Sequence, residues 1–178
     1  MSHKSLSKKD APKNINNNEM VMAKDDLIVS KTDKKGFITY CNKTFIEFSG
    51  YIEDELIGAN HNIIRHPDMP RVAFKLCWDL IQQKQEFFGY VKNLRKDGGF
   101  YWVFAYITAD INEKGDIIGY SSFRKKPSQE GIDAVIPLYK TLLEKEQIGG
   151  MQESQRYLNE FLKSNNTTYD ELISSLQN

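Results

Sequence analysis

The sequence predicts an α+β domain followed by a helical tail. Two short β-rich runs come first, short helical stretches follow, and three further β-rich runs joined by tight turns come after them. Runs dense in β-branched and aromatic residues between turn-forming clusters are typical of strands. Strands and helices that occupy separate blocks of a chain indicate the α+β class. With 178 residues, 40% of them hydrophobic, the chain suffices for one domain core and accessory segments.

Three regions follow from composition. Residues 1–19 are rich in Lys, Ser and Asn and have no apolar run, so they are predicted to be a disordered leader rather than a signal peptide. Residues 20–127 hold the predicted strands and helices of the domain. Residues 128–178 are predicted to be a C-terminal amphipathic helical segment.

The first half of the domain begins with a predicted hairpin. The runs at 26–30 and 36–40 are β-rich and are separated by the turn-forming sequence TDKKG. Asn42 is a plausible N-cap for the short helix that follows. A second short helix over YIEDELIG is expected to stop at Gly58.

A polar stretch, NHNIIRHPDMP at 60–70, precedes the longest predicted helix of the domain. His61 and Asn62 are expected to lie in an extended conformation. Asp68 can cap the next helix and Pro70 suits its first turn. This helix is expected to run to about Lys84. Its apolar face is formed by Ala73, Leu76, Cys77, Leu80 and Ile81.

Three meandering strands complete the predicted domain. They cover 87–95, 100–110 and 117–125, and their β-branched and aromatic content is high. The turn between the first two contains Asp97-Gly98, and the turn between the last two contains Lys114-Gly115. Both pairs are strong hairpin signals.

The tail is expected to form helices. Pro137 either kinks the first helix or starts a new one, and Gly149-Gly150 breaks it. Two shorter amphipathic pieces follow, the second with a capping box from Thr168 to Glu171. An apolar stripe on the first helix is formed by Ile132, Val135, Tyr139 and Leu142. The stripe is expected to dock on a partner, to fold back on its own sheet, or to form a homodimer.

The composition excludes several functions. The formal net charge is zero, so no broad attraction to nucleic acid or anionic membranes is expected. No run approaches the ~20 apolar residues of a membrane-spanning helix. Cys41 and Cys77 form no CxxC, which favours a reduced, cytoplasmic setting. No catalytic triad, phosphate-binding glycine loop or kinase motif is present, so the chain is not expected to be an enzyme.

Four stretches carry a resemblance to a known family. They are ITYCNKTFIEFSGYIEDELIG, HNIIRHPDMPRVAFKLCW, VKNLRKDGGFYWV and IIGYSSFRKKPS. Together they resemble the PAS family, and within it the FAD-binding sensor domain of Aer-type aerotaxis receptors, over about residues 20–145. The resemblance implies a PAS fold, which is a five-stranded antiparallel sheet with short helices on one face, and non-covalently bound FAD.

The resemblance also implies a sensor of redox state or oxygen. Such receptors normally carry a membrane segment and a long signalling domain, and this chain has neither. It looks more like the short PAS-only proteins of bipartite energy-taxis systems. The implied partner is then a separate, membrane-bound methyl-accepting chemotaxis-type signalling protein.

A flavin site needs aromatic surfaces and a partner for the uracil-like edge of the ring. The amide of Asn93 offers both a donor and an acceptor to that edge, and a similar Asn contacts flavin in the light-sensing LOV relatives. A solvent-facing Asn before a turn is the structural alternative. The candidate aromatic surfaces, each equally compatible with a place in the core, are Trp78, Phe88, Tyr101 and Trp102.

The stretch at 60–70 offers polar groups for the same cofactor. Arg65 can form paired hydrogen bonds with phosphate or carboxylate, and His66 can add a donor. Asp68 orients one of them or caps the next helix. His61 and Asn62 could reach the ring or the ribose. In the family, the motif that contains Arg65, His66 and Asp68 is the one most closely tied to cofactor retention.

Other readings use the same residues. His61, His66 and Asp68 could ligate a metal, although a fourth ligand is missing. One of the histidines could be an axial haem ligand, as in haem-binding PAS sensors. Cys77 lies on the apolar helix face and is expected in the core rather than in LOV-type photochemistry. A cofactor-free PAS adaptor is the remaining alternative, since fold does not fix function.

Overall fold

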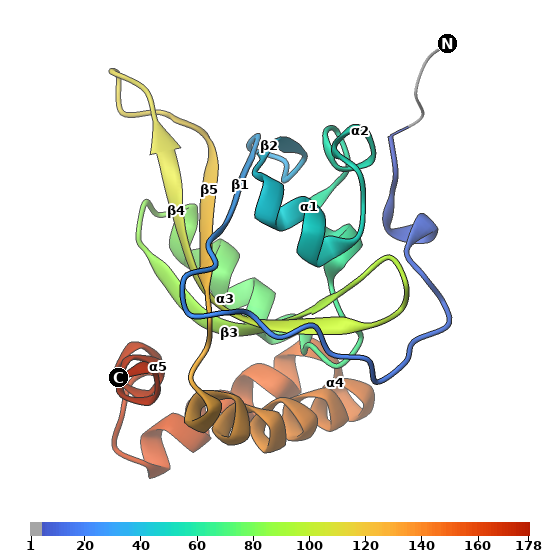
Figure 1. The fold of residues 1–178 in the computed structure, drawn as a ribbon. Helices are drawn as coiled ribbons and strands as arrows, with labels where there is room; N and C mark the ends of the chain where they lie inside the picture. Colours follow the sequence, from blue (N-terminus) through green and yellow to red (C-terminus); the bar gives the residue numbers. More distant parts are fainter. Residues whose placement is uncertain (1–4) are drawn as a thin grey trace.

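Five antiparallel strands form one sheet in the order β2-β1-β5-β4-β3. The computed structural model describes residues 5–178 and is shown in Figure 1. The expected α+β class with a PAS fold is confirmed. The strands are β1 (Ile28–Thr32), β2 (Ile38–Cys41), β3 (Phe87–Leu94), β4 (Phe100–Ile111) and β5 (Ile117–Lys125).

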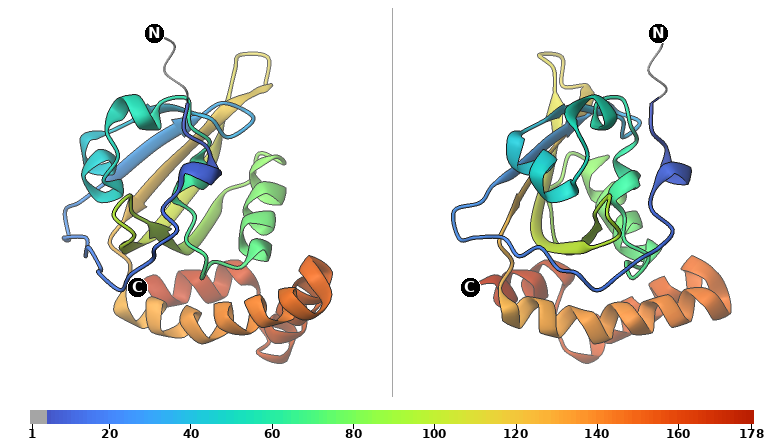
Figure 2. Two further views of the ribbon diagram at one scale, coloured as in Figure 1. Left: turned by 90° about the vertical axis from the view of Figure 1, so that its right-hand side faces the viewer. Right: turned by 45° about the vertical axis from the view of Figure 1, so that its right-hand side comes forward.

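Helices cover the inner face of the sheet and close one end of the domain. α1, α2, η2 and α3 follow β2 and lead into β3, and the two tail helices cross below the sheet (Figures 1 and 2). The helices are the 3₁₀ helices η1 (Lys8–Asp10) and η2 (His61–Ile64), and α1 (Lys43–Ser49), α2 (Glu53–Leu56), α3 (Arg71–Ile81), α4 (Gln129–Ser164) and α5 (Tyr169–Gln177).

The start of α1 follows the sequence prediction. Asn42 is its N-cap: the side-chain oxygen accepts the N–H of Phe45 at 3.1 Å, and the amide donates to the carbonyl of Leu27 at 2.8 Å. α2 ends at Leu56, and Gly58 follows with φ +85°, a left-handed conformation that glycine adopts without strain.

The polar stretch at 60–70 differs from the prediction in two respects. His61 and Asn62 lie in η2 rather than in an extended segment. Asp68 does not cap α3, whose N-cap is Pro70, a residue with no side-chain acceptor. The N–H of Val72 donates instead to Glu146 Oε1 of α4 at 2.9 Å. A carboxylate from the tail therefore satisfies the first turn of α3, which stabilises a helix N-terminus.

The tail folds back on its own domain. α4 continues through Pro137 and is interrupted at Gly149 and Gly150, whose backbone angles are not helical. The apolar stripe packs in one cluster with residues of β3, β4 and α3. The hydroxyl of Tyr139 donates to the carbonyl of Tyr90 at 2.7 Å. Of the three expected roles of the stripe, the structure shows packing on its own sheet. The division of the chain at residue 127 stays a prediction.

Residues 5–19 follow the surface of the domain, which differs from the predicted disordered leader. The N–H of Asn16 donates to the carbonyl of Gly98 at 3.0 Å, and Lys8 Nζ donates to the carbonyl of Arg65 at 2.6 Å. Leu6 and Ala11 pack against the core. These few apolar contacts are not evident from a composition dominated by Lys, Ser and Asn. Residues 1–4 of the predicted leader lie outside the described residues.

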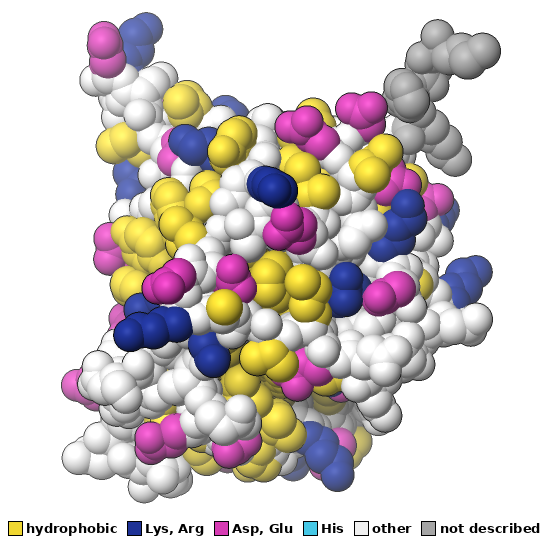
Figure 3. Space-filling model, in the orientation of Figure 1, with side chains coloured by type: hydrophobic (Ala, Val, Ile, Leu, Met, Phe, Trp, Pro, Cys, Tyr) yellow, Lys and Arg dark blue, Asp and Glu magenta, His cyan; other side chains and the backbone are white. Residues whose placement is uncertain are grey.

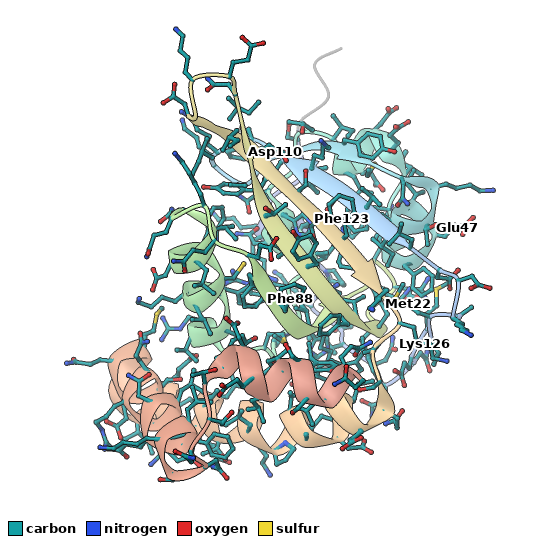
Figure 4. All side chains as sticks on the ribbon, turned by 90° about the vertical axis from the view of Figure 1, so that its left-hand side faces the viewer. Met22, Glu47, Phe88, Asp110, Phe123 and Lys126 are labelled. Carbon is teal, nitrogen blue, oxygen red and sulfur yellow. The ribbon has the colours of Figure 1, made fainter. Side chains whose placement is uncertain are left out.

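The surface shows mixed charge. Acidic and basic side chains are interspersed on the face seen in Figure 3, which agrees with the zero net charge. The outer face of the sheet carries aromatic side chains, among them Phe88 and Phe123 (Figure 4). Within residues 5–178, none of the helices combines the length and the apolar character that crossing a bilayer requires.

Candidate functional site

A cavity of about 140 Å³ lies between the inner face of the sheet, η2 and α3. Apolar and aromatic residues form a little over half of its lining, and most of the remainder are polar side chains, among them two arginines. Five of the ten residues predicted as cofactor contacts line it. These are His61, Asn62, Arg65, Trp78 and Asn93.

The strands place alternate residues toward the cavity, because successive side chains of a strand point to opposite faces. Asn93 on β3 is opposite Tyr101 on β4, and Ala105 on β4 is opposite Arg124 on β5. Asn93, Ala105 and Arg124 all line the cavity, and so does Ser30 of β1. Polar groups from three strands therefore reach one space.

Aromatic surface enters from α3. The ring of Trp78 meets the ring of Tyr120 edge-on, with centroids 5.2 Å apart. The guanidinium of Arg65 lies 3.7 Å from the ring centroid of Phe74, a cation–π contact. Both pairs border the cavity. A flat aromatic ligand is the kind of molecule that such walls accommodate.

Four polar atoms on cavity-lining residues are buried without a hydrogen-bond partner. They comprise three donors, Asn93 Nδ2, Arg65 Nε and Arg124 Nε, and one acceptor, Asn62 Oδ1. The Asn93 side chain does interact electrostatically with the hydroxyl of Tyr101, its neighbour on β4, although the two do not form a hydrogen bond of good geometry. A buried polar atom that lacks a partner destabilises a fold by about 1–3 kcal/mol, so such atoms are rare. Tyr51, Tyr101 and His66 also carry one each, but those three residues do not line the cavity. The clustering of the other four is what indicates a ligand.

The ring of His61 is neutral, and its Nε2 accepts hydrogen bonds from two neighbouring side chains. Its Nε2 lies 3.0 Å from Ser30 Oγ and 3.3 Å from Arg124 Nη1. Arginine can only donate, so Nε2 is the acceptor and the ring proton resides on Nδ1. Burial and the charge of Arg124 lower the pKa of His61 to about 3.

Two residues of the RHPDMP motif point elsewhere. The ring of His66 accepts the N–H of Asp68 through Nδ1 at 3.0 Å and lies edge-on to Phe100. Burial, followed by the charge of Lys92, lowers the pKa of His66 to about 4. The carboxylate of Asp68 is paired with Lys92 Nζ at 2.7 Å. Neither His66 nor Asp68 lines the cavity, so the structure does not bring them to the site.

Three of the predicted aromatic residues also lie outside the cavity. Phe88 is opposite Tyr106, and Trp102 is opposite Lys92. These residues project from the face of the sheet opposite to the face that carries Asn93 and Ala105. The Trp102 ring stacks on Tyr139 of the tail instead. Tyr101 is in the inward phase but packs with Phe48 in the core. The phase of a strand cannot be read from aromatic content alone, because aromatic residues occupy both faces here.

Arg124, Ser30 and Tyr120 line the cavity but were not predicted as site residues. One signal was present in the sequence. Tyr120, Ser122 and Arg124 alternate with residues of the opposite face, so an arginine was placed in the inward phase of a central strand. Such an arginine is rarely buried without a partner.

The alternative ligands find less support in the geometry. Among the described residues 5–178, no three His, Cys, Asp or Glu side chains are grouped to hold a metal ion. Nε2 of His61 already accepts hydrogen bonds from Ser30 and Arg124, so it offers no free position to a haem iron. Cys77 lines the cavity but is 6% exposed, and burial raises the pKa of its thiol to about 12, which keeps it protonated.

Comparison with known proteins identifies a matching protein family and individual relatives of known name. Residues 38–124 match the family model described as the PAS fold. The chain is 45% identical over 121 residues to the aerotaxis receptor of Escherichia coli K12, which covers 68% of this chain and 24% of the receptor. It is 30% identical over 97 residues to the nitrogen fixation regulatory protein of Klebsiella pneumoniae, covering 54% and 20%. The chain thus spans a quarter or less of these relatives.

The solved structures of similar shape include light-oxygen-voltage domains. One was studied with a flavin analogue and has a TM-score of 0.55 at 22% identity, covering 62% of this chain and 83% of that one. Another is the dark state of the blue-light photoreceptor Aureochrome1, with a TM-score of 0.54 at 22% identity, covering 68% and 85%. At this level of identity the likeness establishes the fold alone.

Proposed function

We propose that this chain, which belongs to the PAS family through residues 38–124, binds FAD in its cavity. We propose further that it acts as a redox or oxygen sensor for aerotaxis. It passes a conformational signal to a separate, membrane-bound methyl-accepting chemotaxis-type signalling protein. It works in the cytoplasm and reaches the inner membrane through that partner.

The observation that carries the proposal is the set of unpartnered atoms in the cavity. A flavin ring presents carbonyl and imine acceptors beside one N–H donor. Asn93 Nδ2, Arg65 Nε and Arg124 Nε supply three donors, and Asn62 Oδ1 supplies an acceptor. Trp78 and the apolar lining suit the hydrocarbon part of the ring. The donor and acceptor pattern of this cavity fits the group.

The relatives support the more specific parts. The receptor with 45% identity is an aerotaxis protein, and one solved neighbour was studied with a flavin analogue. FAD rather than a shorter flavin is proposed because the four matching stretches resemble the FAD-binding sensor domain of Aer-type receptors. The guanidinium of Arg65 could pair with a phosphate of either flavin in place of the ring. When bound, the flavin supplies reversible electron uptake that follows the redox state of the cell.

The protein's own residues offer a route from the cavity to the tail. Asn93 is on β3, and the same strand carries Tyr90, whose carbonyl accepts the Tyr139 hydroxyl. Tyr90 Oη also donates to Gln177 Oε1 at 2.8 Å near the end of α5. We infer that a changed hydrogen bond at the Asn93 amide, such as a flip, shifts β3 and with it the hold on the tail.

The test is an absorption spectrum of the freshly purified protein, recorded in air and after dithionite, with mass spectrometry of the released ligand. A two-band flavin spectrum that bleaches on reduction, with FAD as the released mass, is the expected result. FMN alone would correct the cofactor. A Soret band, or a colourless protein that also refuses added FAD, would contradict the proposal and favour a haem sensor or a cofactor-free adaptor respectively.

A further inference from the structure

A buried arginine borders the cavity without a carboxylate to neutralise it. Arg124 on β5 is 2% exposed, and its guanidinium carbon lies 4.5 Å from the ring centroid of Phe45. Among residues 5–178, no Asp or Glu oxygen pairs with it within 4.0 Å. An unpaired buried charge destabilises a fold, so packing alone gives no reason for an arginine here.

Neutral groups hold the guanidinium in place. Arg124 Nη2 donates to Ser30 Oγ at 2.5 Å, and Nη1 donates to the unprotonated Nε2 of His61 at 3.3 Å. Ser30 Oγ is in turn 3.0 Å from the same histidine nitrogen. The three side chains together carry one positive charge, and Nε of Arg124 keeps its hydrogen without a partner.

We propose that Arg124 is a ligand contact that binds the electron-rich carbonyl edge of the flavin and raises its reduction potential. This inference rests on the proposed function, because it requires a flavin in the cavity. A guanidinium donates charge-assisted hydrogen bonds to such oxygens. Electrons that enter the ring add negative charge, which a fixed cation in a low-dielectric site stabilises.

A purely structural role for Arg124 and a ligand-binding role predict different stabilities for the protein without flavin. If the arginine only supported the fold, its removal would destabilise the apoprotein. If it serves the ligand, an apolar side chain of similar length removes an unpaired charge, and the apoprotein keeps or gains stability. Apoprotein stability therefore separates the two roles without reference to signalling.

The experiment compares Arg124→Met, Arg124→Lys and the control Lys125→Met. Lys125 is the next residue of β5, is exposed, and points to the other face of the sheet. Three quantities are measured: the melting temperature of the apoprotein, the dissociation constant for added FAD, and the midpoint potential against a reference dye during dithionite reduction.

We expect Arg124→Met to melt no lower than the wild type, to bind FAD about tenfold to a hundredfold more weakly, and to have a more negative midpoint potential. Arg124→Lys keeps the charge but loses the planar fork, so its potential stays near that of the wild type while its affinity falls. Lys125→Met leaves all three quantities unchanged.

Wild-type affinity and potential in Arg124→Met would overturn the inference and leave the proposed function intact. A wild-type protein that binds no flavin would overturn both. If Arg124→Met does not fold, the ¹H–¹⁵N signal of Arg124 Nε in the wild type decides. FAD moves that proton downfield if Nε gains an acceptor, and an unmoved signal refutes the contact.

Discussion

Arg65 and Asn93 are backbone partners in an isolated antiparallel bridge that joins the end of η2 to β3. Both side chains line the cavity, and each has a nitrogen without a partner. The bridge fixes the backbone positions from which the two side chains enter the cavity before any ligand binds. Such preorganisation lowers the entropy lost on binding.

Replacing Asn93 by Ala is expected to weaken FAD binding about tenfold, because one net hydrogen bond of typical strength is lost. Some flavin stays bound through the other contacts. Redox state should no longer alter the exposure of the tail, since the amide that responds to the ring is missing. Limited trypsin digestion of oxidised and reduced protein, followed by mass spectrometry of the tail fragments, measures this.

The wild type serves as the control for that digestion, with cleavage expected to differ between the oxidised and reduced forms. The tail offers several trypsin sites, namely Lys140, Lys145, Arg156 and Lys163. A variant in which reduction still changes tail cleavage as in the wild type would refute the role of Asn93 in signalling.

The two tryptophans form a matched pair for testing the location of the site. Trp78 lines the cavity, whereas Trp102 does not and touches the wall only from behind, through its stacking on Tyr139. Trp78→Phe is expected to reduce flavin affinity or change the flavin spectrum, because it removes part of the cavity wall. Trp102→Phe is expected to leave both unchanged. Titration with FAD measures both variants, and a larger effect at Trp102 would move the site to the outer face.

The fold was predictable because its local signals agree with the final structure. The turns at Gly98 and Gly115 both have positive φ, and Asn42 caps α1 as expected. The exceptions were long-range contacts. The cap of α3 comes from Glu146, which lies more than seventy residues later in the chain. Such a partner cannot be predicted from the local sequence pattern.

The site was only partly predictable, for a similar reason. Asn93, Arg65 and Trp78 stand in motif stretches and do line the cavity, although their contact with a cofactor stays a prediction. His66 stands in the same motif, yet its ring turns toward Phe100. Arg124 was overlooked because a basic residue near a strand end reads as exposed. Its alternation with Tyr120 and Ser122 was the one sequence signal, and the register of β5 with β4 shows that this set of residues faces inward.

Acid is expected to destabilise the protein through His61 and His66. Their pKa values in the folded protein are about 3 and about 4, below the value near 6.5 of an unfolded histidine. The unfolded chain therefore binds more protons below pH 6.5, so stability is complete above that pH and falls as the pH drops toward the folded values. For His61 the loss between pH 6.5 and pH 5 is at most about 2 kcal/mol.

Urea unfolding at several pH values measures this effect. His61→Gln, which keeps a hydrogen-bonding side chain but cannot titrate, should show a shallower fall in stability between pH 6.5 and pH 5 than the wild type. Carboxylates contribute little in that window, so the comparison isolates the histidine. An equally steep fall in the variant would contradict the lowered pKa of His61.

Glu146 links the tail to the helix that walls the cavity. Its carboxylate accepts the N–H of Val72 and lies 3.5 Å from Arg71 Nε and 3.4 Å from Ser154 Oγ. Glu146→Ala leaves the first turn of α3 without its acceptor, which is expected to lower the free energy of unfolding by about 1–3 kcal/mol. Glu144→Ala is the matched control, because Glu144 is exposed on the same helix.

The two variants also test whether the tail and the cavity are coupled. α3 carries Trp78 and Phe74 into the cavity lining, so loosening its N-terminal turn should weaken FAD binding as well as stability. Chemical unfolding and FAD titration of the same samples measure both. If Glu146→Ala loses stability but binds FAD like the wild type, the cap serves the fold alone. The remaining route to the tail is then Tyr139, which lines the cavity itself and donates to the carbonyl of Tyr90 on β3.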